Sequence, residues 1–230
     1  MSLNIESAAE TLIGGQTLGK ERLELQLGDC HLSLASNSPE LVAGLRDYFA
    51  HVPAPDAASR PDLELIAIES PPPEPPGWDF VDWKREPGKT GRKDAYLDLP
   101  GGRLVKKVRT GMVFLQSETR RIAAGPCREY DNQVINFINA QYMNWLQHRG
   151  WLICHAAGLV RNGRGLGIAG FSGGGKSTLM LHLLEHRDIA YLTNDRLFVR
   201  QEQGRAQALG IPKLPRINPG TIVHNASLQG

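Results

Sequence analysis

The residues best suited to chemistry lie in one stretch, Gly170 to Thr178, with the sequence GFSGGGKST. It fits the pattern G-x-x-x-x-G-K-S/T at every fixed position. The glycines allow successive backbone N–H groups to turn inward toward phosphate oxygens. The ammonium group of Lys176 would reach the β- and γ-phosphates of a nucleotide, and the hydroxyl of Ser177 would bind Mg²⁺. The expected phosphate-binding residues are Gly170, Ser172, Gly173, Gly174, Gly175, Lys176, Ser177 and Thr178.

The sequence on either side predicts the elements that such a loop requires. Residues 166–169 predict a short buried strand that runs into the loop,. Residues 177–185 predict a helix whose positive dipole end would face the phosphates. Its apolar face would consist of Leu179, Met180, Leu183 and Leu184,. A flexible glycine linker is the alternative, but linkers seldom lie between an apolar strand and an amphipathic helix.

Two side chains outside the loop are candidates for catalysis. Asp195 follows the apolar segment 189–192, where a carboxylate near Mg²⁺ is expected, although a plain turn residue is the alternative,. His155 lies in the apolar segment 151–160, which predicts a buried strand,. A histidine in this setting is either a general base or a core residue with satisfied hydrogen bonds.

Basic side chains elsewhere have two interpretations each. Lys213 and Arg216 lie in a proline-stiffened segment and would either neutralise phosphate charge or stay solvated. The basic run from Arg103 to Arg109 would bind phosphate or an acidic protein, or form the solvated face of an edge strand,. Because the solvated face is the more common outcome, we assign no site to this run.

The first half of the chain predicts a small α+β module rich in hairpins. Apolar alternation predicts a hairpin over 23–34 and strands at 63–68 and between 78 and 115,. Ser38 and Pro39 have the residue types that begin a helix,. The proline-rich run 71–76 can be neither a helix nor a central strand and predicts a stiff loop,.

From Asp131 the apolar residues recur with the spacing of a helix, and Gly150 is placed to end the predicted helix,. We therefore expect an α/β (α+β) protein with an N-terminal module over 1–125 and a nucleotide-binding core over 126–230.

The bulk composition is that of a globular protein, with 41% hydrophobic and 22% charged residues,. A net charge of +2 gives no reason to expect nucleic acid or an acidic membrane as a partner,. No apolar run approaches the roughly 20 residues of a membrane span, and the polar N-terminus lacks a secretory signal. The three scattered cysteines predict reduced thiols,. These features together predict a cytoplasmic protein.

The order of these motifs resembles the catalytic core of HPr kinase/phosphorylase, and more closely the HPr-kinase-related proteins. The resemblance covers roughly residues 150–200, with a looser match to Pro219. It rests on His155-Ala156-Ala157-Gly158, a glycine-bearing turn, Gly170 to Thr178, a helix and then Asn194-Asp195. It implies a P-loop kinase core of the HPr kinase and phosphoenolpyruvate carboxykinase type. In this core the loop binds ATP or pyrophosphate, and His155 helps a proton relay.

The function implied by this resemblance is an ATP-dependent, Mg²⁺-requiring kinase that phosphorylates a hydroxyl of a protein serine or a small molecule. His155, Lys176 and Asp195 would be catalytic, and Ser177 and Asp195 would hold the metal. Expected partners are the phosphoacceptor and, in a homo-oligomer, further copies of this chain.

Two features depart from the family pattern. The family has two adjacent aspartates, and the first is Asn194 here, whose amide cannot accept a proton at neutral pH,. The segment after Asp195 is also shorter than in the family, which indicates a C-terminally shortened core. A nucleotide-binding regulatory or scaffold protein without phosphotransfer is therefore the alternative. An ATPase or GTPase is less favoured, because the sequence has neither an N/T-K-x-D guanine pattern nor a separate second aspartate motif.

Overall fold

The computed structural model describes residues 3–56, 59–84, 88, 91–171 and 173–215. Ser172, Arg216 and Pro219, which the sequence singled out, lie outside these residues. The chain divides into two compact units, Met1–Tyr142 and Met143–Gly230. The division falls within helix α3 (Asp131–His148), whereas the change in sequence pattern lies before this helix.

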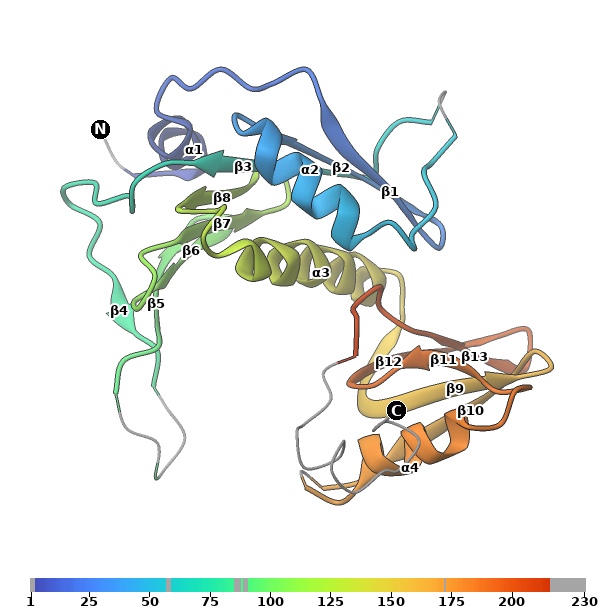
Figure 1. Cartoon of the computed structure of the whole chain (residues 1–230). Coiled ribbons are helices and arrows are strands. Elements are labelled where there is room, and N and C mark those ends of the chain that lie inside the picture. The colour runs from blue at the N-terminus through green and yellow to red at the C-terminus, as the bar shows by residue number, and fades with distance from the viewer. Residues whose placement is uncertain (1–2, 57–58, 85–87, 89–90, 172, 216–230) are drawn as a thin grey trace. The chain divides into compact units, whose positions relative to one another are not determined.

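An eight-stranded mixed sheet forms the first unit (Figure 1). Its spatial order is β1-β2-β3-β8-β7-β6-β5-β4, with β2–β3 and β3–β8 parallel and the other pairs antiparallel. The predicted hairpin is confirmed, with Leu25 opposite Leu32. The strands are β1 (Arg22–Leu27), β2 (Cys30–Ser36), β3 (Leu63–Glu69), β4 (Val81–Asp82), β5 (Asp94–Leu99), β6 (Gly102–Lys107), β7 (Val113–Ser117) and β8 (Arg121–Gly125).

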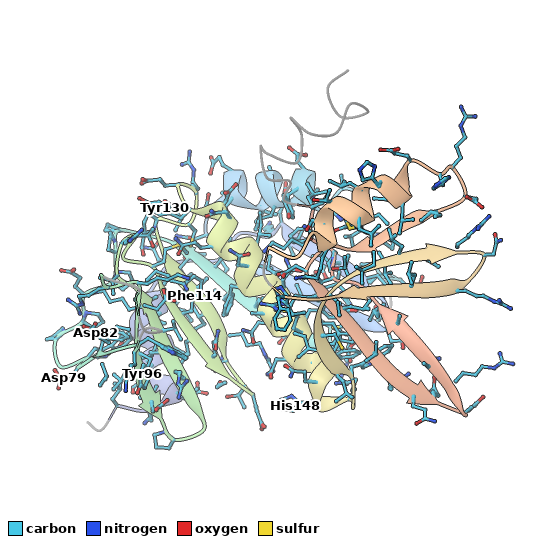
Figure 2. All side chains as sticks on the ribbon, turned by 90° about the horizontal axis from the view of Figure 1, so that it is seen from below. Asp79, Asp82, Tyr96, Phe114, Tyr130 and His148 are labelled. Atoms are coloured by element: carbon cyan, nitrogen blue, oxygen red, sulfur yellow. The ribbon has the colours of Figure 1, made fainter. Side chains whose placement is uncertain are left out.

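Helices cover this sheet because alternate residues of each strand point to opposite faces. Val113 and Leu115 belong to the core that includes Ala8, Ala9 and Leu12 of α1 (Ile5–Ile13). Phe114, which lies between them in β7 (Figure 2), faces α3. Its ring centroid lies 5.1 Å from that of Phe137 on this helix.

Helix α2 (Pro39–Tyr48) contacts β1 and β2. As predicted, it begins at Pro39, and the Ser38 side chain accepts a hydrogen bond from the Leu41 N–H at 3.2 Å.

The buried side chain of His31 links the segment between α2 and β3 to the β1–β2 hairpin. His31 Nε2 lies 2.7 Å from Glu24 Oε2, and Nδ1 lies 2.9 Å from Ser59 Oγ. The His31 backbone N–H donates to Asp62 Oδ2 at 2.9 Å. The side chains form a serine–histidine–carboxylate chain like that of a nucleophilic triad. The Ser59 hydroxyl, however, donates its proton to the Asp56 carbonyl at 2.9 Å and not to His31. These contacts therefore stabilise the fold and do not activate a nucleophile.

Two features of this unit differ from the sequence-based expectations. Strand β8 was not predicted, yet it lies in the middle of the sheet between β3 and β7. The expectation that the basic run from Arg103 to Arg109 lies on an edge strand is also wrong, because β6 is paired on both sides, by β5 and β7. Its cations are paired with acids of neighbouring segments: Arg103 with Asp98, and Lys107 with Asp94 at 3.0 Å.

The second unit contains a five-stranded sheet and helix α4 (Lys176–Leu184). Its described strands pair antiparallel in the order β10-β9-β12-β13, and β11 also pairs with β9. A small core joins Met180 and Leu181 of α4 to Ala157 and Leu159 of β9. The strands are β9 (Leu152–Arg161), β10 (Arg164–Ala169), β11 (Ala190–Thr193), β12 (Arg196–Glu202) and β13 (Arg205–Leu209).

The second unit is less buried than its apolar sequence predicts. Strand β10 was expected to be buried but is largely exposed, with Leu166 50% accessible, because it lies at the edge of the sheet. Only the central part of β9, residues 156–159, is buried, so the expectation of a wholly buried strand is also wrong. On α4, Leu181 is buried in place of the expected Leu179, which is 49% exposed. No helix within the described ranges is both long and apolar enough to cross a bilayer.

Candidate functional site

The predicted phosphate loop lies between β10 and α4, which is the strand–loop–helix order that the motif requires,. Gly173 and Gly175 both have φ of 80°, a left-handed conformation that side chains other than glycine rarely adopt,. The Gly174 N–H donates to the Phe171 carbonyl at 3.0 Å, which closes a tight turn. The glycines therefore let the chain turn directly from strand into helix.

Lys176 folds back over this turn. Its ammonium donates to the carbonyls of Gly170 at 2.9 Å and Phe171 at 3.0 Å. Ser177 is half-buried and Thr178 is exposed in the first turn of α4. The first N–H groups of a helix have no partner within the helix, and no side chain caps α4 at Gly175,. The lysine and these N–H groups form an electropositive turn of the kind that binds phosphate.

The pairing of β9 brings the two other candidates to this turn. Ala156 is opposite Ala169 on β10, so His155 lies beside Gly170, the first residue of the loop. On the other side of β9, His155 is opposite Arg196. Asp195 directly precedes Arg196, and its Oδ1 lies 3.3 Å from His155 Nδ1. Residues that are far apart in the sequence thus meet at one end of the sheet.

His155 and Asp195 are both solvent-accessible. Their side chains are 55% and 45% exposed, so His155 is not the core residue that a wholly buried strand would imply. Its ring Nδ1 also lies 3.0 Å from Nη1 of Arg196. Arg196 is a site residue that was missed from the sequence, and the only signal for it was its position next to Asp195.

Asn194 and Lys213 meet at Tyr191. The Tyr191 hydroxyl lies 3.3 Å from Asn194 Oδ1 and 3.3 Å from the Lys213 carbonyl. Gly210 approaches the Leu192 carbonyl so closely that an added Cβ would clash with that oxygen, so this segment lies directly against β11. The segment after β13 is therefore held near Asn194, which the sequence did not indicate.

The donor atoms are of the kind that binds a metal ion together with phosphate. Within the described ranges, no three histidine, cysteine or acidic side chains are grouped so as to hold a metal ion alone. Mg²⁺ at nucleotide sites is bound by only one or two protein oxygens together with substrate phosphates. Ser177 and Asp195 offer one hydroxyl and one carboxylate of the required kind.

Comparison with known proteins adds no relative: no family model, no curated protein and no solved structure matches this chain.

Proposed function

We propose that the second unit is a phosphotransferase of the HPr-kinase-related type, which binds ATP with Mg²⁺ and transfers the γ-phosphate to a hydroxyl of a protein serine or a small molecule. The register of β9 is the observation that carries this proposal. A phosphate loop alone supports nucleotide binding. A histidine beside its first residue, with a carboxylate within 3.3 Å, adds a base and a group to stabilise the protonated base,.

Each residue has a role in this mechanism. The N–H groups of 173–178 hold the phosphates, and Lys176 exchanges its contacts with backbone carbonyls for the β- and γ-phosphates,. His155 takes the proton of the acceptor hydroxyl, and Asp195 stabilises the resulting imidazolium. Mg²⁺, held by Ser177 and Asp195, would supply charge neutralisation between the phosphates. The acceptor would be met in the cytoplasm, which the reduced thiols expected of three scattered cysteines favour,.

A nucleotide-binding regulatory protein without phosphotransfer is the second candidate, and Asn194 favours it. The family pattern places an aspartate at this position as general base, and the amide of Asn194 cannot take a proton. In this alternative the loop binds nucleotide and the bound nucleotide stays intact.

Thermal unfolding with and without Mg-ATP tests the nucleotide site. A ligand at 100 times its dissociation constant stabilises the folded state by about 2.7 kcal/mol. If the whole chain melts as one cooperative unit, its melting temperature should rise by roughly 5 to 10 °C. Lys176→Ala should abolish the rise, because it removes the cation that the phosphates require. Arg164→Ala, a charge removal at the far end of β10, should retain it.

The fate of the nucleotide then separates the two candidates. Formation of ADP by the wild-type protein, lost in Lys176→Ala, supports transfer. Nucleotide that is recovered intact after long incubation with candidate acceptors supports the regulatory protein. A cooperative melt that Mg-ATP leaves unchanged contradicts both.

A further inference from the structure

A cavity of about 250 Å³ lies in the first unit, between strands β6 and β7 and helix α3. All the residues that line it belong to this unit. Phe114 of β7, labelled in Figure 2, and Phe137 of α3 supply apolar surface to its lining. Small-molecule sites are mostly apolar, with a few polar groups that fix the ligand, and typically measure roughly 300–1,000 Å³. A cavity just below this range has room for one small ring-shaped molecule.

Three side-chain amides supply hydrogen-bonding groups to this cavity. They belong to Gln116 on β7 and to Gln133 and Asn136 on α3. Gln133 Oε1 accepts a hydrogen bond from Thr110 Oγ1 at 3.2 Å, so its amide N–H groups can serve a ligand. Within the described ranges, the Gln116 side chain makes no hydrogen bond. An amide both donates and accepts hydrogen bonds, as a hydroxyl does. The cavity therefore suits a ligand rich in hydroxyl groups.

The cations on this face of the sheet already have acidic partners. Lys107 and Arg103 lie two residues to either side of Val105 on β6, and such residues share a face,. Lys107, which lines the cavity, has its Nζ 3.0 Å from Asp94 Oδ1. The Nε of Arg103 lies 2.5 Å from Asp98 Oδ1. A charged ligand would have to compete with one of these ion pairs, whereas a neutral ligand leaves both intact.

The phenylalanine rings do not favour a planar ligand. The centroids of Phe114 and Phe137 are 5.1 Å apart and their planes are inclined by 36°, so the rings pack on each other. Each of the two side chains is only 4% exposed. A nucleobase is held by stacking on an open aromatic face, and neither ring offers one. Contact between buried rings and the C–H groups of a puckered or open-chain ligand needs no such face.

We propose that this cavity binds a small neutral polyhydroxylated molecule, either a monosaccharide or a polyol. Its hydroxyl groups exchange hydrogen bonds with the amides of Gln116, Gln133 and Asn136, and its C–H groups contact the apolar lining. This inference goes beyond the proposed function and does not depend on it, because every residue that carries it lies in the first unit.

Saturation-transfer difference NMR on the full chain, without nucleotide, tests the inference. The neutral probes are glucose, galactose, ribose, mannitol, myo-inositol and glycerol, each added alone. Gluconate represents a charged ligand and adenosine a planar one. At least one neutral probe should give a signal that saturates with concentration. Direct detection of the ligand is needed because concentrated sugars stabilise any folded protein by being excluded from its surface.

Two variants locate the binding in the cavity. Ala140→Phe places a large side chain in the lining and should abolish the signal. Gln116→Met keeps the length of the side chain but removes its amide, so the dissociation constant should rise roughly fivefold to tenfold. Gln16→Met makes the same change at an exposed position outside the cavity and should bind like the wild type. Melting without ligand shows whether each variant is folded.

Three results would overturn the inference: no signal from any neutral probe, signals that Ala140→Phe and Gln116→Met leave unchanged, or cavity binding by gluconate or adenosine alone. Lys176→Ala should give the wild-type signals, because the phosphate loop lies in the second unit. A chain that binds a neutral probe in this cavity but fails to bind Mg-ATP would contradict the proposed function and leave this inference standing.

Discussion

At the scale of single residues, Asn194 is the position at which the identity of the base in the proposed transfer can be tested. Replacing it with aspartate would place a carboxylate near the Tyr191 hydroxyl, which now lies 3.3 Å from the amide oxygen. A positioned general base contributes typically 10²–10⁴-fold to a rate, so Asn194→Asp should speed transfer by about 10²-fold. The measurement is the rate of ADP formation from Mg-ATP, with water as the default acceptor. Asn194→Ala is the control, because it removes the amide without adding a base. Equal rates for the two variants would leave His155 as the base.

Cys127 should make the free energy of unfolding of the first unit fall at alkaline pH. Burial, with a smaller contribution from Glu69, raises the pKa of its thiol to about 12 from the ordinary 9.0. The unfolded chain therefore loses this proton first, so stability is complete below about pH 9 and falls as the pH rises toward 12,. The loss should approach about 1.4 kcal/mol per pH unit.

Urea unfolding at several alkaline pH values measures this slope. Cys127→Ala should reduce the slope, whatever its effect on stability at neutral pH. Burial also raises the pKa of the Tyr142 hydroxyl, so Tyr142→Phe should reduce it further. An unchanged slope in both variants would show that other groups set the alkaline limit.

At the scale of elements, the segment that contains Lys213 lies directly against β11 at Gly210. A Cβ at position 210 would clash with the Leu192 carbonyl oxygen, so the backbone must shift to admit it. Gly210→Ala should destabilise the second unit by about 1–3 kcal/mol, as overpacking generally does. It should also weaken nucleotide binding if that segment belongs to the site. Urea unfolding and a nucleotide titration measure the two effects.

Gly165→Ala is the matched control in the same unit. Its added Cβ would lie 3.4 Å from the Cβ of Ala208, which is an ordinary contact, so stability should hardly change. Similar losses in the two variants would mean that the carbonyl contact of Gly210 has no special role.

At the scale of the whole molecule, the two units predict two responses to ligand. A ligand stabilises only the cooperative unit that binds it, unless the units unfold together. The thiols report on each unit separately, because Cys30 and Cys127 are buried in the first and Cys154 is half-buried in the second. In moderate urea, Mg-ATP should slow thiol labelling of Cys154 and leave Cys30 and Cys127 unaffected. Lys176→Ala should remove the protection, and equal protection of all three thiols would show that the units unfold as one.

Local features of this fold were predictable from the sequence. The cap at Ser38, the hairpin with Leu25 opposite Leu32, and the glycine loop before α4 depend on residues close together in the chain. The backbone preferences of single residues and the spacing of apolar residues depend on such near neighbours, so the residue types alone indicate these elements.

The meeting of distant segments was decided only by the tertiary structure. Strand β8 is central because it pairs with β3 and β7, and β13 (RAQAL) is a strand because β12 pairs with it. Neither pairing depends on neighbours in sequence. The register of β9 likewise sets His155 between Gly170 and Arg196, because strand register depends on which faces pack against the rest of the unit,. The sequence by itself therefore determined the glycine-rich loop between β10 and α4, and the pairing of the strands determined which side chains lie beside it.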